Sequence, residues 1–184
     1  MPFNAYEFRS QLQGDGARPN LFEVQLVFPT SVNPGAANRK LTFMCKTSSM
    51  PGMTIGHVPL FYFGREVKLA GNRTFPEWTL SVINDEDFNV RNAFEKWMNS
   101  MNRVVTNVRD QWAGNSLGYS TTALVNQFSK TGEILKTYNF VGMFPVDMSQ
   151  IDLDWGSNDT IEEFSVTLAY QYFTATAKDG TVII

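Results

Sequence analysis

Apolar and polar residues alternate along residues 160–173, and this stretch constrains the fold more than any other part of the sequence. A period of two is typical of a β-strand with one buried face and one solvated face. At roughly 3.3 Å per residue the fourteen residues would extend about 45 Å, whereas strands usually have about five or six residues. The apolar face would comprise Phe164, Val166, Leu168, Tyr170 and Tyr172. So long a strand needs partners along its whole length, and we expect neighbouring subunits to supply some of them.

Similar patterns predict further strands and the loops between them. Alternating or short apolar runs occupy residues 21–28, 41–47, 58–63, 65–69, 74–83 and 133–144. Pro145 should end the last of these strands, and Pro76 places part of the 74–83 strand at an edge or a bulge. Turn-forming composition predicts loops at residues 29–38, 48–56 and 104–130. Residues 1–19 should form an N-terminal arm, and residues 174–184 a C-terminal tail.

One helix is predicted after Asp85, where the apolar spacing changes from two to a helical repeat. The residues that would share its apolar face are Val90, Phe94, Trp97, Met98 and Met101. Asn84 or Asp85 would cap the helix. Many strands, one helix and no alternating βαβ pattern predict a single mainly β domain over residues 1–184. We expect an antiparallel β-sandwich or barrel with one flanking α-helix.

Composition excludes several classes of protein. The formal net charge of −3 argues against a protein that grips nucleic acid electrostatically. A single cysteine rules out an intrachain disulfide, and the first residues lack the regions of a signal peptide, so we expect an intracellular fold. No apolar run approaches the length of about 18 residues that a membrane span requires.

Residue types that carry catalysis or bind metals are scarce. His57 lies in a predicted loop with no orienting partner, and Cys45 lies on an apolar strand face. Asp152, Asp154 and Asp159 suggest a calcium site. An EF-hand loop that begins at Asp152 needs glycine at its sixth position, however, and that position is Ser157. A solvated acidic turn is therefore the better interpretation. We predict no catalytic residue, no metal and no cofactor, and hence no enzyme.

Several segments, in the same order and spacing, resemble the tail tube proteins of T4-like contractile-tailed bacteriophages. This family belongs to the phage tail tube and type VI secretion tube superfamily. The segments are ARPNLF at 17–22, FMCK at 43–46 with the Met50-Pro51 loop, AGNRTF at 70–75 with WTL at 78–80, NDE at 84–86, and LDW at 153–155 through TLA at 167–169. The resemblance covers most of residues 17–173.

The resemblance implies a structural subunit of a six-fold ring. Long strands of each subunit would join edge to edge into one continuous β-barrel around a channel, which would also remove exposed strand edges. Rings would stack into a tube, surrounded by a sheath protein and completed by baseplate and tail terminator proteins. Double-stranded DNA would pass through without stable binding, and no membrane is involved. The protein would belong to the virion and be assembled in the host bacterial cytoplasm.

Two sets of residues are candidates for roles in such a tube. For ring stacking we predict Met50, Pro51, Met53 and His57 of the Met-rich loop, with Phe3, Tyr6 and Phe8 of the arm. The alternative is that the methionines only cover the end of the barrel. For a lumen that repels phosphate the acidic candidates are Asp152, Asp154, Glu162 and Glu163. These carboxylates would serve equally as a solvated outer face.

Two features depart from the family pattern, and three alternative functions stay open. The 29–38 loop and the tail after Phe173 would either decorate the tube or lengthen the contact between rings. The chain would also suit the inner tube of a bacterial secretion or contractile injection machine, or a baseplate protein that caps a tube. A monomeric β-barrel that binds a small ligand is the remaining alternative.

Overall fold

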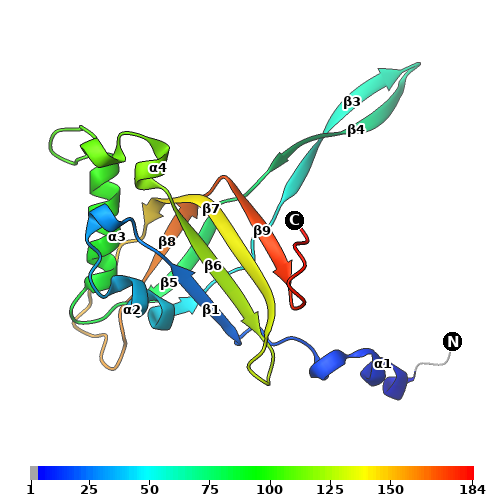
Figure 1. The fold of residues 1–184 in the computed structure, drawn as a ribbon, viewed down its shortest axis with the longest axis horizontal. Helices are drawn as coiled ribbons and strands as arrows, with labels where there is room; N and C mark the ends of the chain where they lie inside the picture. Colours follow the sequence, from blue (N-terminus) through cyan, green and yellow to red (C-terminus); the bar gives the residue numbers. More distant parts are fainter. Residues whose placement is uncertain (1–3) are drawn as a thin grey trace.

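The structure is a computed structural model that describes residues 4–184. One antiparallel sheet, with strand order β1-β6-β7-β8-β5-β2 and β9 added on β7, curls until it is nearly closed into a barrel. A separate two-stranded sheet, β3 with β4, projects from this body (Figure 1). The strands are β1 (Phe22–Leu26), β2 (Cys45–Thr47), β3 (Thr54–Tyr62), β4 (Arg65–Thr74), β5 (Trp78–Ile83), β6 (Thr121–Phe128), β7 (Ile134–Met148), β8 (Glu163–Ala169) and β9 (Tyr172–Ala177). The predicted mainly β, antiparallel fold is confirmed.

The barrel core is built from the alternating apolar faces of β1, β5 and β8. Trp78, Leu80 and Val82 of β5 stand opposite Leu168, Val166 and Phe164 of β8, and all six are buried. Burying a large apolar side chain of this kind stabilises the fold by roughly 1.5–3 kcal/mol. The core face predicted for these strands is confirmed.

The predicted helix is present as α3 (Asn89–Met101), which covers one side of the barrel (Figure 1). Phe94 and Trp97 of this helix pack on Phe28, with ring centroids 4.8 and 5.8 Å apart. The predicted cap is wrong, because the N-cap is Phe88 in the left-handed region, with φ 51°. Asp85 is engaged elsewhere, since its carboxylate binds Lys40 at 2.6 Å.

The predicted long strand over 160–173 is wrong in one respect: it is two strands with a bend between them. Phe164 to Tyr170 keep the predicted buried face, but Tyr172 is 48% exposed and Phe173 is buried. Opposite the bend, Gly142 of β7 has φ 69°, and a Cβ there would lie 2.7 Å from Gln171 Cγ. Gly142 and the bend therefore allow β7 and the β8–β9 pair to curve together, which wraps the sheet.

β7 runs past the residue predicted to end it and is the longest strand, with 15 residues. Pro145 pairs with Leu168, and the register shifts between Pro145 and Asp147. The missing proline N–H falls at this irregularity, where a strand tolerates it. Along the rest of its length β7 pairs with β6 on one edge and β9 on the other.

Residues 41–47, predicted as a strand, are mostly helix. α2 (Ala37–Met44) precedes a three-residue β2 and begins inside the predicted 29–38 loop, after the short 3-10 helix η2 (Thr30–Val32). Ala37 and Leu41, four residues apart, are both buried, whereas Phe43 is 73% exposed. The alternation of Leu41, Phe43 and Cys45 thus coincides with a helix that buries Leu41 together with Ala37 and leaves Phe43 exposed.

Residues 104–130, predicted as a loop, contain a central strand. After the short helices η3 (Gln111–Ala113) and α4 (Ser116–Tyr119), β6 pairs with both β1 and β7. Its buried polar side chains explain the error: Gln127 Nε2 donates to the Arg18 carbonyl at 2.6 Å, and Asn126 Oδ1 accepts from Thr137 Oγ1 at 2.8 Å. These hydrogen bonds offset the cost of burying two amides.

The two ends of the chain differ in how they meet the body. The N-terminal arm contains α1 (Ala5–Gln11) and the 3-10 helix η1 (Gln13–Asp15), and α1 lies away from the barrel (Figure 1). The tail, by contrast, includes the end of β9 and then folds back, so that Ile183 N donates to the Ala175 carbonyl at 2.7 Å. Among the described residues, no helix combines the length and apolar character that a membrane crossing requires.

Candidate assembly surfaces

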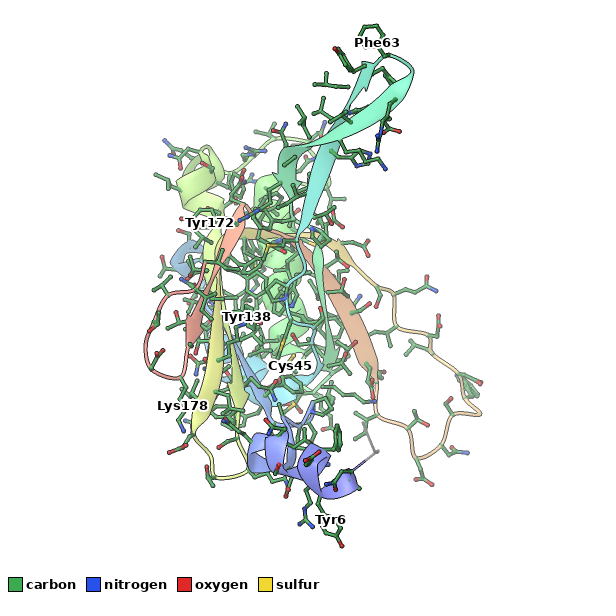
Figure 2. The ribbon with its side chains drawn as sticks, turned by 90° about the vertical axis from the view of Figure 1, so that its right-hand side faces the viewer. Tyr6, Cys45, Phe63, Tyr138, Tyr172 and Lys178 are labelled. Atoms are coloured by element: carbon green, nitrogen blue, oxygen red, sulfur yellow. The ribbon has the colours of Figure 1, made fainter. Side chains whose placement is uncertain are left out.

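The β3–β4 hairpin lacks a covering layer within residues 4–184. The two strands pair only with each other, and every residue of β3 is exposed. Cross-strand register places Val58 opposite Leu69 and Leu60 opposite Val67, so these four side chains share one face. The opposite face carries Pro59, Lys68, Phe61 and Glu66. The hairpin is therefore an amphipathic ribbon, which Figure 2 shows standing clear of the barrel.

The apolar face of this ribbon is only half covered. Val58, Leu60, Val67 and Leu69 are 46–51% exposed. A two-stranded ribbon is marginally stable at best in water, and exposed contiguous apolar surface marks a site of interaction. The hairpin therefore needs a partner that covers this face.

The tip of the hairpin is aromatic and strained. Phe63 is 92% exposed, and its φ of 47° lies in the left-handed region that bulky side chains rarely adopt. Gly64 follows with φ 78°, so both turn residues have positive φ, as in the two-residue hairpin turn that usually carries Asn-Gly. The Tyr62 and Phe63 rings meet edge to face, with centroids 4.5 Å apart. Strain of this kind at an exposed position indicates a functional constraint.

The loop residues predicted to stack rings lie at the base of this hairpin. Met50, Pro51 and Met53 lie on the connection between β2 and β3, where Met50 is 49% and Met53 39% exposed. The connection is held to the body because Trp78 Nε1 donates to the Ser49 carbonyl at 2.8 Å. The predicted loop ends at residue 53 rather than 56, so His57 lies in β3 itself.

The aromatic residues of the arm are also exposed. Tyr6 and Phe8 of α1 are 85% and 67% exposed, and no residue of α1 is buried. Phe3, the third predicted residue of the arm, lies outside the described residues. The arm is tethered to the body through Asp15, which binds Lys130 at 3.3 Å.

The four predicted lumen carboxylates fall in two places. Glu163 begins β8 and binds Lys46 at 2.6 Å. Asp152, Asp154 and Glu162 lie on the connection of residues 149–162 between β7 and β8. Glu162 accepts a hydrogen bond from Asn84 at 2.8 Å, and Asp154 accepts one from the Gly156 N–H at 2.9 Å.

Three apolar side chains on the same connection were not predicted. Trp155 is fully exposed, Leu153 is 81% exposed and Ile161 67%. Leu153 and Trp155 belong to the LDW segment that carries the family resemblance, but nothing in the sequence marked these three side chains as exposed. Acidic and apolar groups thus share one exposed loop, which projects from the body in Figure 2.

The hairpin and this connection leave the barrel at opposite ends of the same strands. β4 leads into Trp78, which pairs with Leu168, while the 149–162 connection leads into Glu163, which pairs with Ile83. Figure 2 shows Phe63 at one extreme of the molecule and Tyr6 of the arm at the other. The subunit therefore has two chemically different ends.

The outer face of β5 and β8 is lined by small hydroxyl side chains. Thr79 stands opposite Thr167, with their hydroxyl oxygens 3.1 Å apart, and Ser81 stands opposite Ser165. A face of this kind is polar without a strong charge of either sign.

Two observations concern metal ligands and the single thiol. Among residues 4–184 no three His, Cys, Asp or Glu side chains come together as a metal site would require. Burial raises the pKa of the Cys45 thiol to about 12, which keeps it protonated and unreactive.

Comparison with known proteins identifies relatives over most of the chain. The family profile described as "Phage tail tube protein" matches residues 17–176. The tail tube protein gp19 of Enterobacteria phage T4 is 31% identical over 161 residues, which is 87% of this chain and 92% of that protein. The tail tube protein of Serratia phage KSP90 is 23% identical over 166 residues, or 89% of this chain and 92% of that protein.

Solved structures share the fold at lower sequence identity. A chain of the anti-feeding prophage baseplate has a TM-score of 0.61 at 16% identity, covering 89% of this chain and 97% of that chain. A chain of the sheath-tube complex of an extracellular contractile injection system has a TM-score of 0.52 at 15% identity, covering 95% and 99%.

Proposed function

The chain belongs to the phage tail tube protein family, and on this premise we propose that it forms hexameric rings that stack into a hollow tube through which DNA passes. It is a structural protein of the virion, and its relatives are not enzymes. The resemblance inferred from the sequence is confirmed. What we propose beyond family membership is six copies per ring, the stacking of rings and the passage of DNA.

The observation that carries the proposal is the uncovered hairpin. Its apolar face and both strand edges are exposed in the isolated subunit. Exposed edges normally invite uncontrolled pairing, and a closed ring satisfies them without leaving a free end. The hairpin is thus complete only when neighbouring copies cover it.

The outer face of β5 and β8 is the surface we assign to the channel. Hydroxyl side chains hydrate well and offer phosphate no fixed cation, so DNA would slide without being held. Glu163 lies on this face and is paired with Lys46. Lumen placement of Asp152, Asp154 and Glu162 stays a prediction. If these carboxylates only face the lumen, reversing their charge would slow DNA ejection while tubes persist, and unchanged ejection would contradict that placement.

Partners follow from the assemblies in which the structural neighbours occur. Those neighbours come from a six-fold symmetrised baseplate, a sheath-tube complex and a sheath/tube terminator. We propose that this chain likewise meets a sheath, a baseplate and a terminator protein. For the ring-stacking residues Met50, Pro51, Met53 and His57, their place at the base of the hairpin supports a contact between rings.

Two alternatives differ in how the structure supports them. The inner tube or cap of an injection system shares the fold, so cargo and partners, rather than architecture, separate it from the proposal. A ligand-binding barrel is less well supported, because the interior is filled by aromatic side chains. Trp78 and Phe140, for example, are buried with ring centroids 4.7 Å apart.

Negative-stain electron microscopy of the purified protein, at low and then high concentration, tests the proposal. Six-fold rings or hollow tubes are the expected result. A protein that stays monomeric even when purified baseplate or tube seeds are added would contradict it.

A further inference from the structure

We propose that the apolar face of the hairpin seats on the 149–162 connection of a copy in the adjacent ring. This inference rests on the proposed function and names the surface that receives the hairpin. Hairpin and connection lie at opposite ends of each subunit, as β5 and β8 place them. A head-to-tail contact between copies would therefore bring the two together in every successive ring.

Charge complementarity favours this pairing. Residues 54–74 carry Arg65, Lys68 and Arg73 against Glu66, a net charge of 3 − 1 = +2. Residues 149–162 carry Asp152, Asp154, Asp159 and Glu162 and no Lys or Arg, a net charge of −4. None of these four carboxylates forms an ion pair within residues 4–184. Of the hairpin's charged residues, Arg65 lies on the apolar face, whereas Lys68 and Glu66 lie on the opposite face. The Arg65 cation and the four carboxylates are thus left for partners of opposite sign.

Apolar complementarity points the same way. The connection exposes Leu153, Trp155 and Ile161 at 81%, 102% and 67%. Exposed tryptophan is enriched among the residues that dominate protein interfaces. The hairpin offers its half-exposed leucines and valines, with Tyr62 and Arg65 further out on the same face. Arg65 lies within this apolar face, so one hairpin surface presents a cation and an apolar patch to a loop that has both counterparts.

The hairpin is long enough to reach the next ring. β3 has nine residues, so the hairpin extends about 30 Å at roughly 3.3 Å per residue. Its tip therefore lies well beyond the end of its own barrel, as Figure 1 shows. A surface at the far end of another copy is the nearest one that it would meet in a stack.

This role differs from the lumen role predicted for Asp152, Asp154 and Glu162, and the two have different consequences. A carboxylate that only faces the channel affects DNA passage and leaves stacking intact. One that receives the hairpin affects tube growth itself. Charge reversal on the connection separates the two.

The test is a charge swap between the two surfaces. Asp152→Lys with Asp154→Lys should leave rings intact but raise the critical concentration for tubes by about tenfold or more, because attraction becomes repulsion at each contact. Adding Arg65→Glu, which reverses the cation on the apolar face, should lower the critical concentration again by about threefold or more, whereas adding Lys68→Glu on the opposite face instead should not. Glu95→Lys, a single charge reversal on the exposed side of α3 that removes only the ion pair with Arg91, is the control and should leave tube formation unchanged.

Cross-linking gives a readout that does not depend on weakened assembly. In chains with Cys45→Ala, the pair Phe63→Cys and Trp155→Cys should form intermolecular disulfides in assembled tubes, and Phe63→Cys with Val105→Cys should not. Unchanged tubes after the charge reversal, or slowed DNA ejection with normal tubes, would overturn the inference. So would the absence of the cross-link from well-formed tubes. Failure of the original chain to form rings would count against the proposed function instead.

Discussion

Replacing two leucines on the apolar face of the hairpin should weaken tube assembly without unfolding the subunit. We consider the double substitution Leu60→Ser with Leu69→Ser. Each leucine is about half exposed, at 51% and 49%, and faces a valine of the opposite strand. The hairpin lies outside the barrel core, so the melting temperature of the barrel should hardly change.

The size of the effect follows from the area that a partner would still cover. Full burial of a leucine is worth roughly 1.5–3 kcal/mol, so covering the remaining half of both side chains is worth about 1.5–3 kcal/mol in total. Losing this energy weakens each hairpin contact by about 10- to 150-fold. Within the monomer, the two lost cross-strand pairs cost about 0.2–1 kcal/mol each, and this loss stays local to the ribbon.

The assay is the critical concentration for tube formation, measured by sedimentation and checked by electron microscopy. Val105→Ser is a suitable control, because Val105 is 94% exposed on the turn after α3 and undergoes a comparable change. Circular dichroism and thermal melting establish that each variant is folded. A critical concentration within about twofold of the original, in a folded double variant, would refute the argument that the hairpin face is an assembly surface.

Four further predictions concern the thiol (two of them), the core and the arm. Iodoacetamide should modify the half-buried Cys45 thiol on the order of 100-fold more slowly in the native protein than in urea, and equal rates would contradict its raised pKa. Because its pKa is raised to about 12, the stability that the protonated thiol contributes is present below about pH 9 and lost as the pH rises toward 12, which urea titrations at several pH values would detect. Leu80→Ala, at a buried position, should lower the free energy of unfolding by about 2–5 kcal/mol, and a loss below about 1 kcal/mol would be inconsistent with its place in the core. Deleting residues 1–12 should shorten or abolish tubes at an unchanged melting temperature, whereas normal tubes would exclude the arm from ring contacts.

The parts of the fold that follow from local periodicity were predictable from the sequence. Trp78, Leu80 and Val82 alternate because β5 has one buried face, and Phe94 and Trp97 repeat with the turn of α3. Both patterns depend only on the geometry of one element. The structure has both elements, and the predicted residues of each are buried.

The wrong predictions of secondary structure fall where contacts between distant parts of the chain determine the local structure. β6 was missed because Asn126 and Gln127 are buried polar residues whose partners lie far along the chain. The bend after β8 depends on Gly142 of β7, which alternation within residues 160–173 cannot reveal. Leu41 belongs to a helix although its neighbours alternate, because only one of the apolar residues there enters the core.

The candidate surfaces were predictable only in part. The methionine loop and the arm were recognised from composition, and both prove to be exposed. The hairpin beside the loop was not recognised as an exposed surface, because alternation along β3 and β4 does not reveal whether the same chain covers the apolar face. Trp155 was overlooked for a similar reason, since aromatic residues in a β-rich chain usually indicate core.

Hydrogen–deuterium exchange of the hairpin, compared between dilute subunits and assembled tubes, tests the central claim most directly. We expect β3 and β4 to be covered only by other copies of the chain. Their amides should therefore exchange rapidly in the isolated subunit and slow by about 100-fold or more in tubes, while the amides of β5 and β8 stay protected in both. A hairpin already protected in the dilute subunit, or one that still exchanges rapidly within intact tubes, would contradict the account.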